Sequence, residues 1–160
     1  MSKLALYPGS FDPITFGHID IIRRGLNIFD RVTVGIGVNI SKEPLFGLEE
    51  RMEMINELFA EDDRVNVTSY DILTAMFAEE IGAMAIIRGL RAVSDFEYEF
   101  QMTLANRELF PAGETVFLMP SLNHVYLKSS LVKEVSRLGG DVASFVPPSV
   151  EARLAEKYGD

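Results

Sequence analysis

The 160-residue chain contains no cysteine. This absence excludes disulfide bonds, thiolate nucleophiles and zinc sites built from thiolates, and it agrees with a reducing compartment. Basic residues are also scarce, because 15 Lys and Arg stand against 24 Asp and Glu and leave a formal net charge of −9. Since affinity for DNA or RNA depends largely on cationic contacts to phosphates, a broad nucleic-acid-binding surface is excluded.

The sequence also lacks long hydrophobic runs. The longest stretch without a charged residue covers 13 residues, from Thr115 to Leu127, and Pro120 interrupts it. A membrane-spanning helix needs about 20 apolar residues, and the apolar start at Leu4 is too short for a signal peptide. We therefore expect a cytoplasmic protein with no membrane partner.

No linker, internal repeat or low-complexity segment divides the chain. A length of 160 residues suits one domain, and 48% apolar residues are enough to fill one core. We expect a single domain over residues 1–160.

Short runs of mostly apolar residues alternate with longer segments of helical spacing. The predicted strands are Lys3–Tyr7, Arg31–Val38, Val65–Ser69, Ala85–Ile87 and Thr115–Leu118. Such continuous apolar runs are typical of a parallel sheet covered on both faces. The pattern predicts an α/β fold, a doubly wound, Rossmann-like, five-stranded parallel sheet with helices on both faces and a short C-terminal helix.

Apolar stripes in the helical segments are expected to face the core. The stripes are Ile19, Ile22, Leu26 and Phe29; Leu48, Met52, Ile55 and Phe59; Met76, Phe77 and Ile81; Phe96, Phe100 and Leu104; and Leu131, Val135 and Leu138. Ser94 to Glu97 has the pattern of a capping box, Gly82 and Gly139 stand where helices should end, and Pro148 should begin the final helix.

Ligands of doubly wound sheets bind at the carboxyl ends of the strands. The loop after the first strand carries Gly9, two prolines and Gly17, and it leads to His18 in the first turn of a helix. Because a helix N-terminus presents free N–H donors, His18 is well placed to bind a phosphate. The alternative is that His18 only caps its helix.

Cationic residues follow two further strands and begin a later helix. Lys42 follows the second strand, Arg88 and Arg91 follow the fourth, and Lys128 and Lys133 flank Ser129 and Ser130. Their placement predicts an anionic substrate and a second phosphate cradle at the serines, although each cation alone could be a solvated surface charge. Thr74 could likewise be only a helix N-cap.

Several other patterns are weak. Gly35 and Gly37 begin like a dinucleotide fingerprint but lie inside a strand, where glycines favour close packing. The Glu49–Arg51 run and the acidic run 61–63 are interpreted as solvated surface. No acidic pair or histidine cluster has the spacing of a metal site, so we expect no metal ligands from the protein.

Two longer motifs resemble a known superfamily. Gly9–His18 resembles the T/H-x-G-H signature of the nucleotidyltransferases, and Lys128–Lys133 resembles their serine-rich second signature. With Ile87–Glu99 added, essentially the whole chain is similar to the family of bacterial phosphopantetheine adenylyltransferases. Two positions depart from the family pattern: Lys128 replaces the first of three serines, and Phe16 stands where asparagine is frequent.

The resemblance implies the fourth step of coenzyme A synthesis, in which ATP and 4′-phosphopantetheine give 3′-dephospho-coenzyme A and pyrophosphate. It also implies Mg²⁺ delivered with ATP, a homohexamer, and coenzyme A as a feedback ligand. Alternatives are another small-molecule nucleotidyltransferase, such as a nicotinamide-nucleotide adenylyltransferase or a cytidylyltransferase, and a regulatory subunit that binds nucleotide without catalysis.

The resemblance also implies roles for individual residues. His18 and Lys42 would be catalytic, and His18 would stabilise the transition state at the α-phosphate. Ser10, Lys42, Thr74 and Arg88 would hold phosphopantetheine. The ATP site would comprise Ser10, Phe11, His18, Gly89, Leu90, Arg91, Glu99, His124, Val125, Tyr126, Leu127, Lys128, Ser129 and Ser130. The attacking phosphate oxygen is ionised at neutral pH, so the direct in-line transfer needs no general base and no covalent intermediate.

Overall fold

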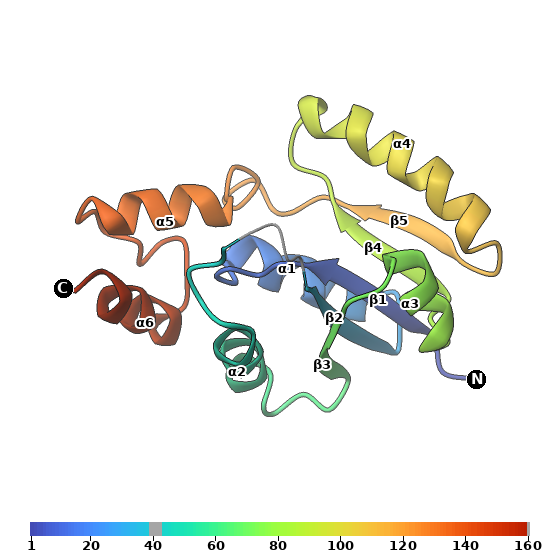
Figure 1. The fold of residues 1–160 in the computed structure, drawn as a ribbon, viewed down its shortest axis with the longest axis horizontal. Coiled ribbons are helices and arrows are strands. Elements are labelled where there is room, and N and C mark those ends of the chain that lie inside the picture. Colours follow the sequence, from blue (N-terminus) through green and yellow to red (C-terminus); the bar gives the residue numbers. More distant parts are fainter. Residues whose placement is uncertain (39–42, 160) are drawn as a thin grey trace.

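The computed structural model describes residues 1–38 and 43–159. In chain order the elements are β1 (Leu4–Gly9), α1 (Phe16–Leu26), β2 (Arg31–Gly37), α2 (Leu48–Leu58), β3 (Val65–Tyr70), α3 (Thr74–Glu80), β4 (Ala85–Gly89), α4 (Val93–Leu109), β5 (Glu114–Leu118), α5 (Ser129–Arg137) and α6 (Pro148–Tyr158) (Figure 1). All five predicted strands are present, and the final helix begins at Pro148 as predicted.

The five strands form one parallel sheet in the order β3-β2-β1-β4-β5. The chain winds outward from β1 to β3 on one side and then returns to build β4 and β5 on the other. The strand order therefore reverses at β1 and β4, and loops leaving these two strands diverge at their carboxyl ends. The predicted doubly wound fold is confirmed, and the ligand crevice is expected above β1 and β4.

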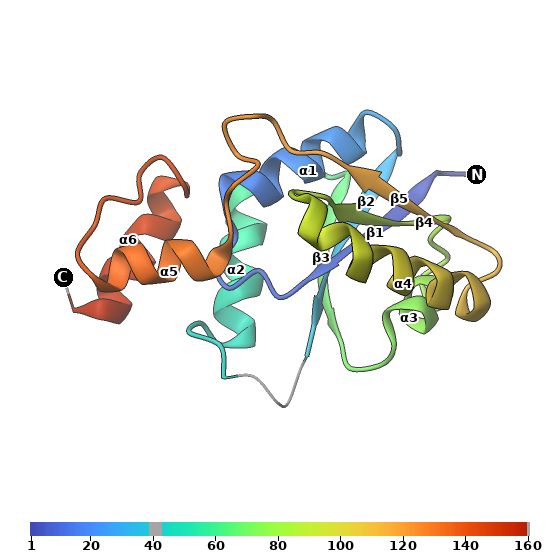
Figure 2. The ribbon, with the colours of Figure 1, turned by 90° about the horizontal axis from the view of Figure 1, so that it is seen from above.

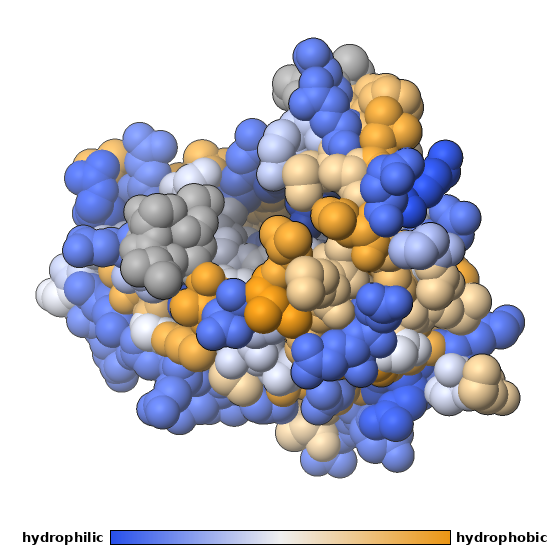
Figure 3. All heavy atoms as spheres, turned by 45° about the vertical axis from the view of Figure 1, so that its right-hand side comes forward, coloured by the Kyte–Doolittle hydropathy of each residue, from blue (hydrophilic) through white to orange (hydrophobic). Residues whose placement is uncertain are grey.

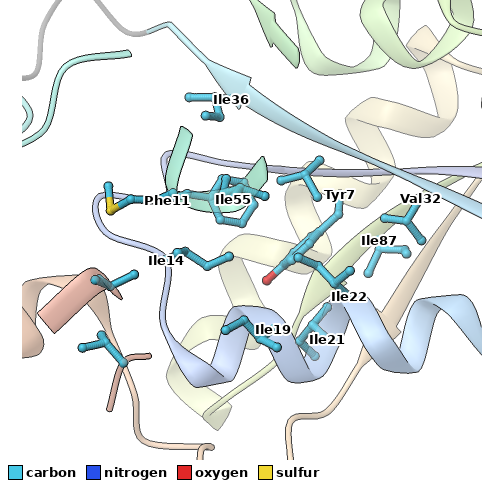
Figure 4. Packing of buried hydrophobic residues seen from close by; sticks show 14 of the residues in the cluster. Tyr7, Phe11, Ile14, Ile19, Ile21, Ile22, Val32, Ile36, Ile55 and Ile87 are labelled. Carbon is cyan, nitrogen blue, oxygen red and sulfur yellow. The ribbon is translucent and has the colours of Figure 1, made fainter. Parts of the chain in front are cut away.

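Alternate side chains of β1 and β4 belong to two different cores. Ala5 and Tyr7 pack in a cluster with residues of α1 and α2, whereas Leu6 and Ile86 pack with residues of α3. Figure 2 shows α1 on one side of the sheet and α3 and α4 on the other, and Figure 4 shows Tyr7 directed from β1 toward α1. Both faces of the central strands are covered, which explains their continuous apolar sequences.

Gly35 lies where β2 packs closely against its neighbours. A Cβ atom at this position would lie 2.8 Å from Leu6 Cδ1 and 3.0 Å from Tyr70 Cε1. Any larger residue would have to displace these side chains. The prediction that the glycines of β2 serve close packing is confirmed for Gly35.

The predicted helix ends agree with the structure except at α4. Gly82 and Gly139 follow their helices with φ of 70° and 80°, as expected of left-handed C-terminal glycines. The capping-box prediction is wrong, because α4 begins at Val93 and its N-cap is Ala92, without a side-chain cap. The Leu90 N–H donates to the Leu118 carbonyl (3.0 Å), so the loop that precedes α4 is held beside β5.

The expected core stripe of α4 is also wrong. Phe96, Phe100 and Leu104 are each about half exposed, at 50%, 51% and 49%, whereas Glu99 and Asn106 are buried. The helix therefore turns its polar stripe inward and its apolar stripe outward. Figure 3 shows apolar side chains gathered on this face of the molecule. Helical spacing identifies an apolar stripe, but it does not show whether that stripe packs against the rest of the same chain.

Candidate active site

The loop after β1 is held in an unusual conformation. Phe11 has a φ of 47°, a left-handed conformation that costs a bulky residue about 1 kcal/mol or more. Its ring is 2% exposed and meets Tyr7 edge to face with centroids 5.3 Å apart. The buried ring holds the strained turn in place, and Ser10 precedes it at the carboxyl end of β1.

Two charged groups from distant segments fix this loop. The Arg51 guanidinium donates to the Ser10 carbonyl (2.9 Å). The Asp12 carboxylate, 5% exposed, accepts the N–H groups of Leu45 (3.0 Å) and Phe46 (2.9 Å) and the Lys133 ammonium (2.9 Å). Arg51 is 7% exposed, so its interpretation as solvated surface is wrong. The Glu49–Arg51 run gives no sign of the Ser10 carbonyl that Arg51 contacts, because Ser10 lies 41 residues away in the chain.

His18 both caps α1 and faces the crevice above β1. Its Nδ1 accepts the Thr15 N–H (3.0 Å), while the His18 N–H donates to Thr15 Oγ1 (3.4 Å). An Nδ1 that accepts an amide proton leaves the proton of a neutral imidazole on Nε2. Burial, with a smaller effect of the nearby Arg91 charge, lowers the pKa of His18 to about 4. His18 is therefore a neutral N–H donor at pH 7. It caps its helix, as the alternative interpretation expected, and its role in binding a phosphate stays a prediction.

A cavity of about 490 Å³ opens above β1 and β4, next to His18. Nine of the predicted site residues line it: Ser10, Phe11, His18, Arg88, Gly89, Arg91, Glu99, His124 and Leu127. They come from the loop after β1, α1, the end of β4, α4 and the segment before α5. We call this space the first cavity.

Arg88 is held by a bidentate ion pair under α4. Its Nε and Nη2 donate to the two carboxylate oxygens of Glu99, at 2.9 and 2.7 Å. Burial opposes the charged form of Arg88, but the paired carboxylate outweighs this effect, and the pKa of the guanidinium lies above its ordinary value. Both oxygens of Glu99 are thus engaged in orienting Arg88.

A second cavity, of about 130 Å³, lies between α4 and the sheet. Thr74, Met102 and Asn106 line it, and it shares Arg88 and Glu99 with the first cavity. The alternative interpretation of Thr74 as an N-cap is wrong, since Leu73 holds that position. The Thr74 hydroxyl instead pairs with the Tyr70 hydroxyl at 2.9 Å.

A third cavity, of about 370 Å³, adjoins the N-terminus of α5. Ser10, Ser129, Ser130 and Lys133 line it, so Ser10 borders both the first and the third cavity. The Ser129 hydroxyl donates to the Pro13 carbonyl (2.8 Å), which joins the serine-rich segment to the loop after β1. The two predicted phosphate cradles are therefore neighbours.

Other predicted site residues are less closely grouped. Lys128 is exposed at the N-cap of α5 and does not line the three cavities, nor do Leu90, Val125 and Tyr126. Lys42 lies outside the described residues. The expected convergence of cations is thus partial: Arg88 and Arg91 share the first cavity, and Lys133 lines the third.

Among the residues that line the first cavity without having been predicted, three carry polar side-chain groups. Tyr7 and Tyr98 contribute their rings, and burial raises the pKa of the Tyr7 hydroxyl above its ordinary value. Asp95 presents one carboxylate oxygen, Oδ2, that has no hydrogen-bond partner among the described residues. Asp95 lies in the Ile87–Glu99 motif, but the sequence pattern was interpreted there only as a capping box.

Within residues 1–38 and 43–159, no group of three or more acidic or histidine side chains could hold a metal ion. Over the same residues, no helix is both long enough and apolar enough to cross a membrane.

The chain resembles known proteins in sequence and in fold. Residues 6–135 match the model of the cytidylyltransferase-like family. The chain is 51% identical to a phosphopantetheine adenylyltransferase of Caldanaerobacter subterraneus subsp. tengcongensis, over 98% of both chains. It is 54% identical to that of Methylacidiphilum infernorum, over 98% of this chain and 92% of the relative. A bifunctional NMN adenylyltransferase/ADP ribose pyrophosphatase from Francisella tularensis shares the fold with a TM-score of 0.71 and 13% identity, over 99% of this chain and 52% of that one.

Proposed function

The chain belongs to the phosphopantetheine adenylyltransferases within the cytidylyltransferase-like family, and from this premise we propose its reaction. It transfers the adenylyl group of ATP to 4′-phosphopantetheine, which gives 3′-dephospho-coenzyme A and pyrophosphate. The observation that carries the proposal is the position of the neutral His18 donor in the wall of a cavity that shares lining residues with two smaller ones. Three adjacent spaces suit a nucleotide base, a leaving diphosphate and an acceptor.

The chemistry requires charge stabilisation rather than proton removal. A phosphate oxygen of the acceptor attacks the α-phosphorus of ATP, and the bond from that phosphorus to the oxygen of the leaving pyrophosphate breaks. The nucleophile is already ionised, so no base is needed. Negative charge grows on the non-bridging oxygens, where the Nε2–H of His18 can donate.

The three cavities suggest where each part of the substrates binds. We assign the nucleoside and α-phosphate to the first cavity and the leaving diphosphate to the third, where Ser129 and Ser130 begin α5. The acceptor phosphate would contact Arg88. Its pantetheine arm, which carries two amides and short apolar links, suits the side chains of Met102 and Asn106 in the second cavity.

Two predicted residues take revised or untested roles in this scheme. Glu99 acts through Arg88, because both of its carboxylate oxygens are already paired there. The role of Lys42 as a further phosphate donor stays a prediction. Magnesium would arrive on the ATP phosphates with much of its own water, since the described residues offer it no carboxylate cluster.

We also propose a homohexamer in the cytoplasm, with coenzyme A as a competing ligand that resembles the product. The exposed apolar stripe of α4 supports self-association, because three half-exposed apolar side chains on one helix favour a protein neighbour. Phe100→Glu should reduce the mass measured by sedimentation velocity, while Gln101→Glu adds the same charge outside the stripe and should preserve it. Equal masses for the two variants would contradict a contact through this stripe.

The reaction is tested by pyrophosphate release from ATP or CTP, with 4′-phosphopantetheine or nicotinamide mononucleotide as acceptor. We expect turnover only with ATP and 4′-phosphopantetheine. Turnover only with CTP, or only with nicotinamide mononucleotide, would show that the chain is another nucleotidyltransferase. Tight ATP binding without pyrophosphate release in the presence of any acceptor would indicate a regulatory subunit.

A further inference from the structure

The segment Ser121–Leu127 forms one wall of the first cavity without being a helix or a strand. His124 and Leu127 line the cavity, and two successive backbone bonds shape the segment, from the His124 N–H to the Ser121 carbonyl (2.9 Å) and from the Leu127 N–H to the His124 carbonyl (3.1 Å). The Ser121 hydroxyl also lies 3.0 Å from His124 Nδ1. We call this segment the nucleotide wall. Such a short irregular segment needs external contacts to keep one shape.

Those contacts come from the beginning of α1. The Asp20 carboxylate accepts the Ser121 N–H at 2.7 Å, although 101 residues separate them. The Phe16 ring stacks on the His124 imidazole, with centroids 5.8 Å apart and planes inclined by 30°. Phe16 and Asp20 are four residues apart and therefore lie on the same side of α1.

Close backbone approach completes the docking. A Cβ atom on Gly17 would lie 3.4 Å from the His124 carbonyl oxygen and 3.7 Å from Leu127 Cβ. The nucleotide wall thus rests directly on the first turn of α1, beside His18. On its other side, the Arg91 guanidinium donates to the Leu127 carbonyl (3.0 Å). The nucleotide wall is therefore held by α1 and by the Arg91 guanidinium.

From these contacts we propose that Phe16 and Asp20 are positioning residues for ATP. They hold the nucleotide wall against the helix that carries His18, so that the surface receiving the nucleoside and the donor facing the α-phosphate keep one geometry. This inference rests on the proposed function in taking ATP as the nucleotide. It also gives a role to Phe16, a position at which this chain departs from the family pattern.

The physical reason is the ordering of the wall before the ligand arrives. A binding surface that must first be ordered loses affinity by the free energy of that ordering. Removing one hydrogen bond or one aromatic stack from the docked wall should therefore weaken ATP binding about 5- to 10-fold. The second cavity does not contact the wall, so the acceptor should bind as before.

Matched variants separate this role from a general effect on folding. Asp20→Ala removes the acceptor for the Ser121 N–H, whereas Asp20→Asn keeps one. Arg24→Ala removes the Arg24–Asp20 ion pair (3.0 Å) and leaves the bond to Ser121. In the same way, Phe16→Ala removes the stack on His124 and Phe16→Tyr retains it.

The experiment is calorimetric titration of each variant with Mg²⁺-ATP in the absence of acceptor, followed by steady-state kinetics. We expect a 5- to 10-fold higher Kd and KM for ATP in Asp20→Ala and Phe16→Ala, with KM for 4′-phosphopantetheine within twofold of wild type. Asp20→Asn, Arg24→Ala and Phe16→Tyr should bind ATP within twofold of wild type. Unchanged ATP affinity in both alanine variants, or an equal loss for ATP and acceptor, would overturn the proposal.

The outcome is distinguishable from failure of the proposed function. A wild-type protein that binds ATP but makes no dephospho-coenzyme A would refute the proposed reaction, while the ATP titrations would still decide the role of Phe16 and Asp20. A wild-type protein that does not bind ATP would overturn both.

Discussion

The protonation state of His18 leads to a prediction that pH can test. Because its pKa is lowered to about 4, only about 1% of His18 is charged at pH 6, whereas most of an ordinary histidine with a pKa near 6.5 would be charged. We therefore expect no inflection from His18 in the dependence of kcat on pH between 5 and 8. The acceptor phosphate, with a second pKa near 6, can still produce an acid limb.

Substitution by glutamine provides the matched control. Glutamine at the third position of a helix can accept the Thr15 N–H with its carbonyl and present an amide N–H that does not titrate. His18→Gln should keep the same acid limb as wild type and more activity than His18→Ala. The alanine variant loses a preorganised donor, and its kcat should fall about 100- to 1000-fold. Pyrophosphate release measured from pH 5 to 8 compares all three proteins.

The lowered pKa of His18 should also make the free energy of unfolding depend on pH. The unfolded chain takes up a proton on His18 near pH 6.5, whereas the folded protein takes it up only near pH 4. The free energy of unfolding contributed by the neutral ring is thus complete above pH 6.5 and is lost as the pH falls toward 4. A difference of 2.5 pH units corresponds to at most about 3 kcal/mol. Urea unfolding of wild type and His18→Gln at pH 7 and pH 4.5 isolates this contribution.

One result would refute the reasoning about His18. If wild type shows an inflection near pH 6.5 that is absent from His18→Gln, the His18 imidazole is charged in part of the pH range in which the protein is active. The Nδ1 contact with the Thr15 N–H would then not determine the tautomer, and a neutral Nε2 donor would be the wrong description.

Further substitutions test the supports of the site. Asp12→Asn turns an amide either toward the Lys133 ammonium and the Leu45 N–H or toward the Phe46 N–H, and it should lower the urea-derived free energy of unfolding by about 2–3 kcal/mol; a loss below about 0.5 kcal/mol would show that these contacts do not stabilise the loop. Glu99→Gln weakens the bidentate pair with Arg88, so KM for the acceptor should rise about tenfold and more than KM for ATP, and the reverse order would favour a direct role in ATP binding. Gly35→Ala overpacks β2 and should cost about 1–3 kcal/mol by the same unfolding measurement, whereas a neutral effect would show that the neighbouring side chains can move.

Much of the fold follows from local patterns. The strand positions were predictable because the central strands are covered on both faces and therefore need apolar side chains without interruption. The loop after β1 was predictable as a candidate site because a parallel sheet brings the carboxyl ends of its strands together, and the first cavity opens beside this loop. The motifs around His18 and around Ser129 and Ser130 then carried the family resemblance that indicated the reaction.

Other features depended on partners far away in the chain. The burial of Arg51 depends on the Ser10 carbonyl, 41 residues away, and the ion pair of Lys133 depends on Asp12, 121 residues away. Neither charged residue carries a local signal that distinguishes it from solvated surface. The periodicity of α4 was correct, but its direction was not, because the side that faces the sheet carries Glu99 and Asn106.

The sequence alone determined the order of strands and helices, the edge of the sheet at which the first cavity opens and, through the family resemblance of its motifs, the type of reaction. These depend on hydrophobic periodicity and on short motifs. Only the tertiary structure decided that His18 is a neutral donor, that Glu99 is engaged by Arg88 and that α1 supports the nucleotide wall. The physical reason is that protonation, ion pairing and docking are set by burial and by the groups within hydrogen-bonding distance. Folding brings those groups together from positions that are remote in the chain.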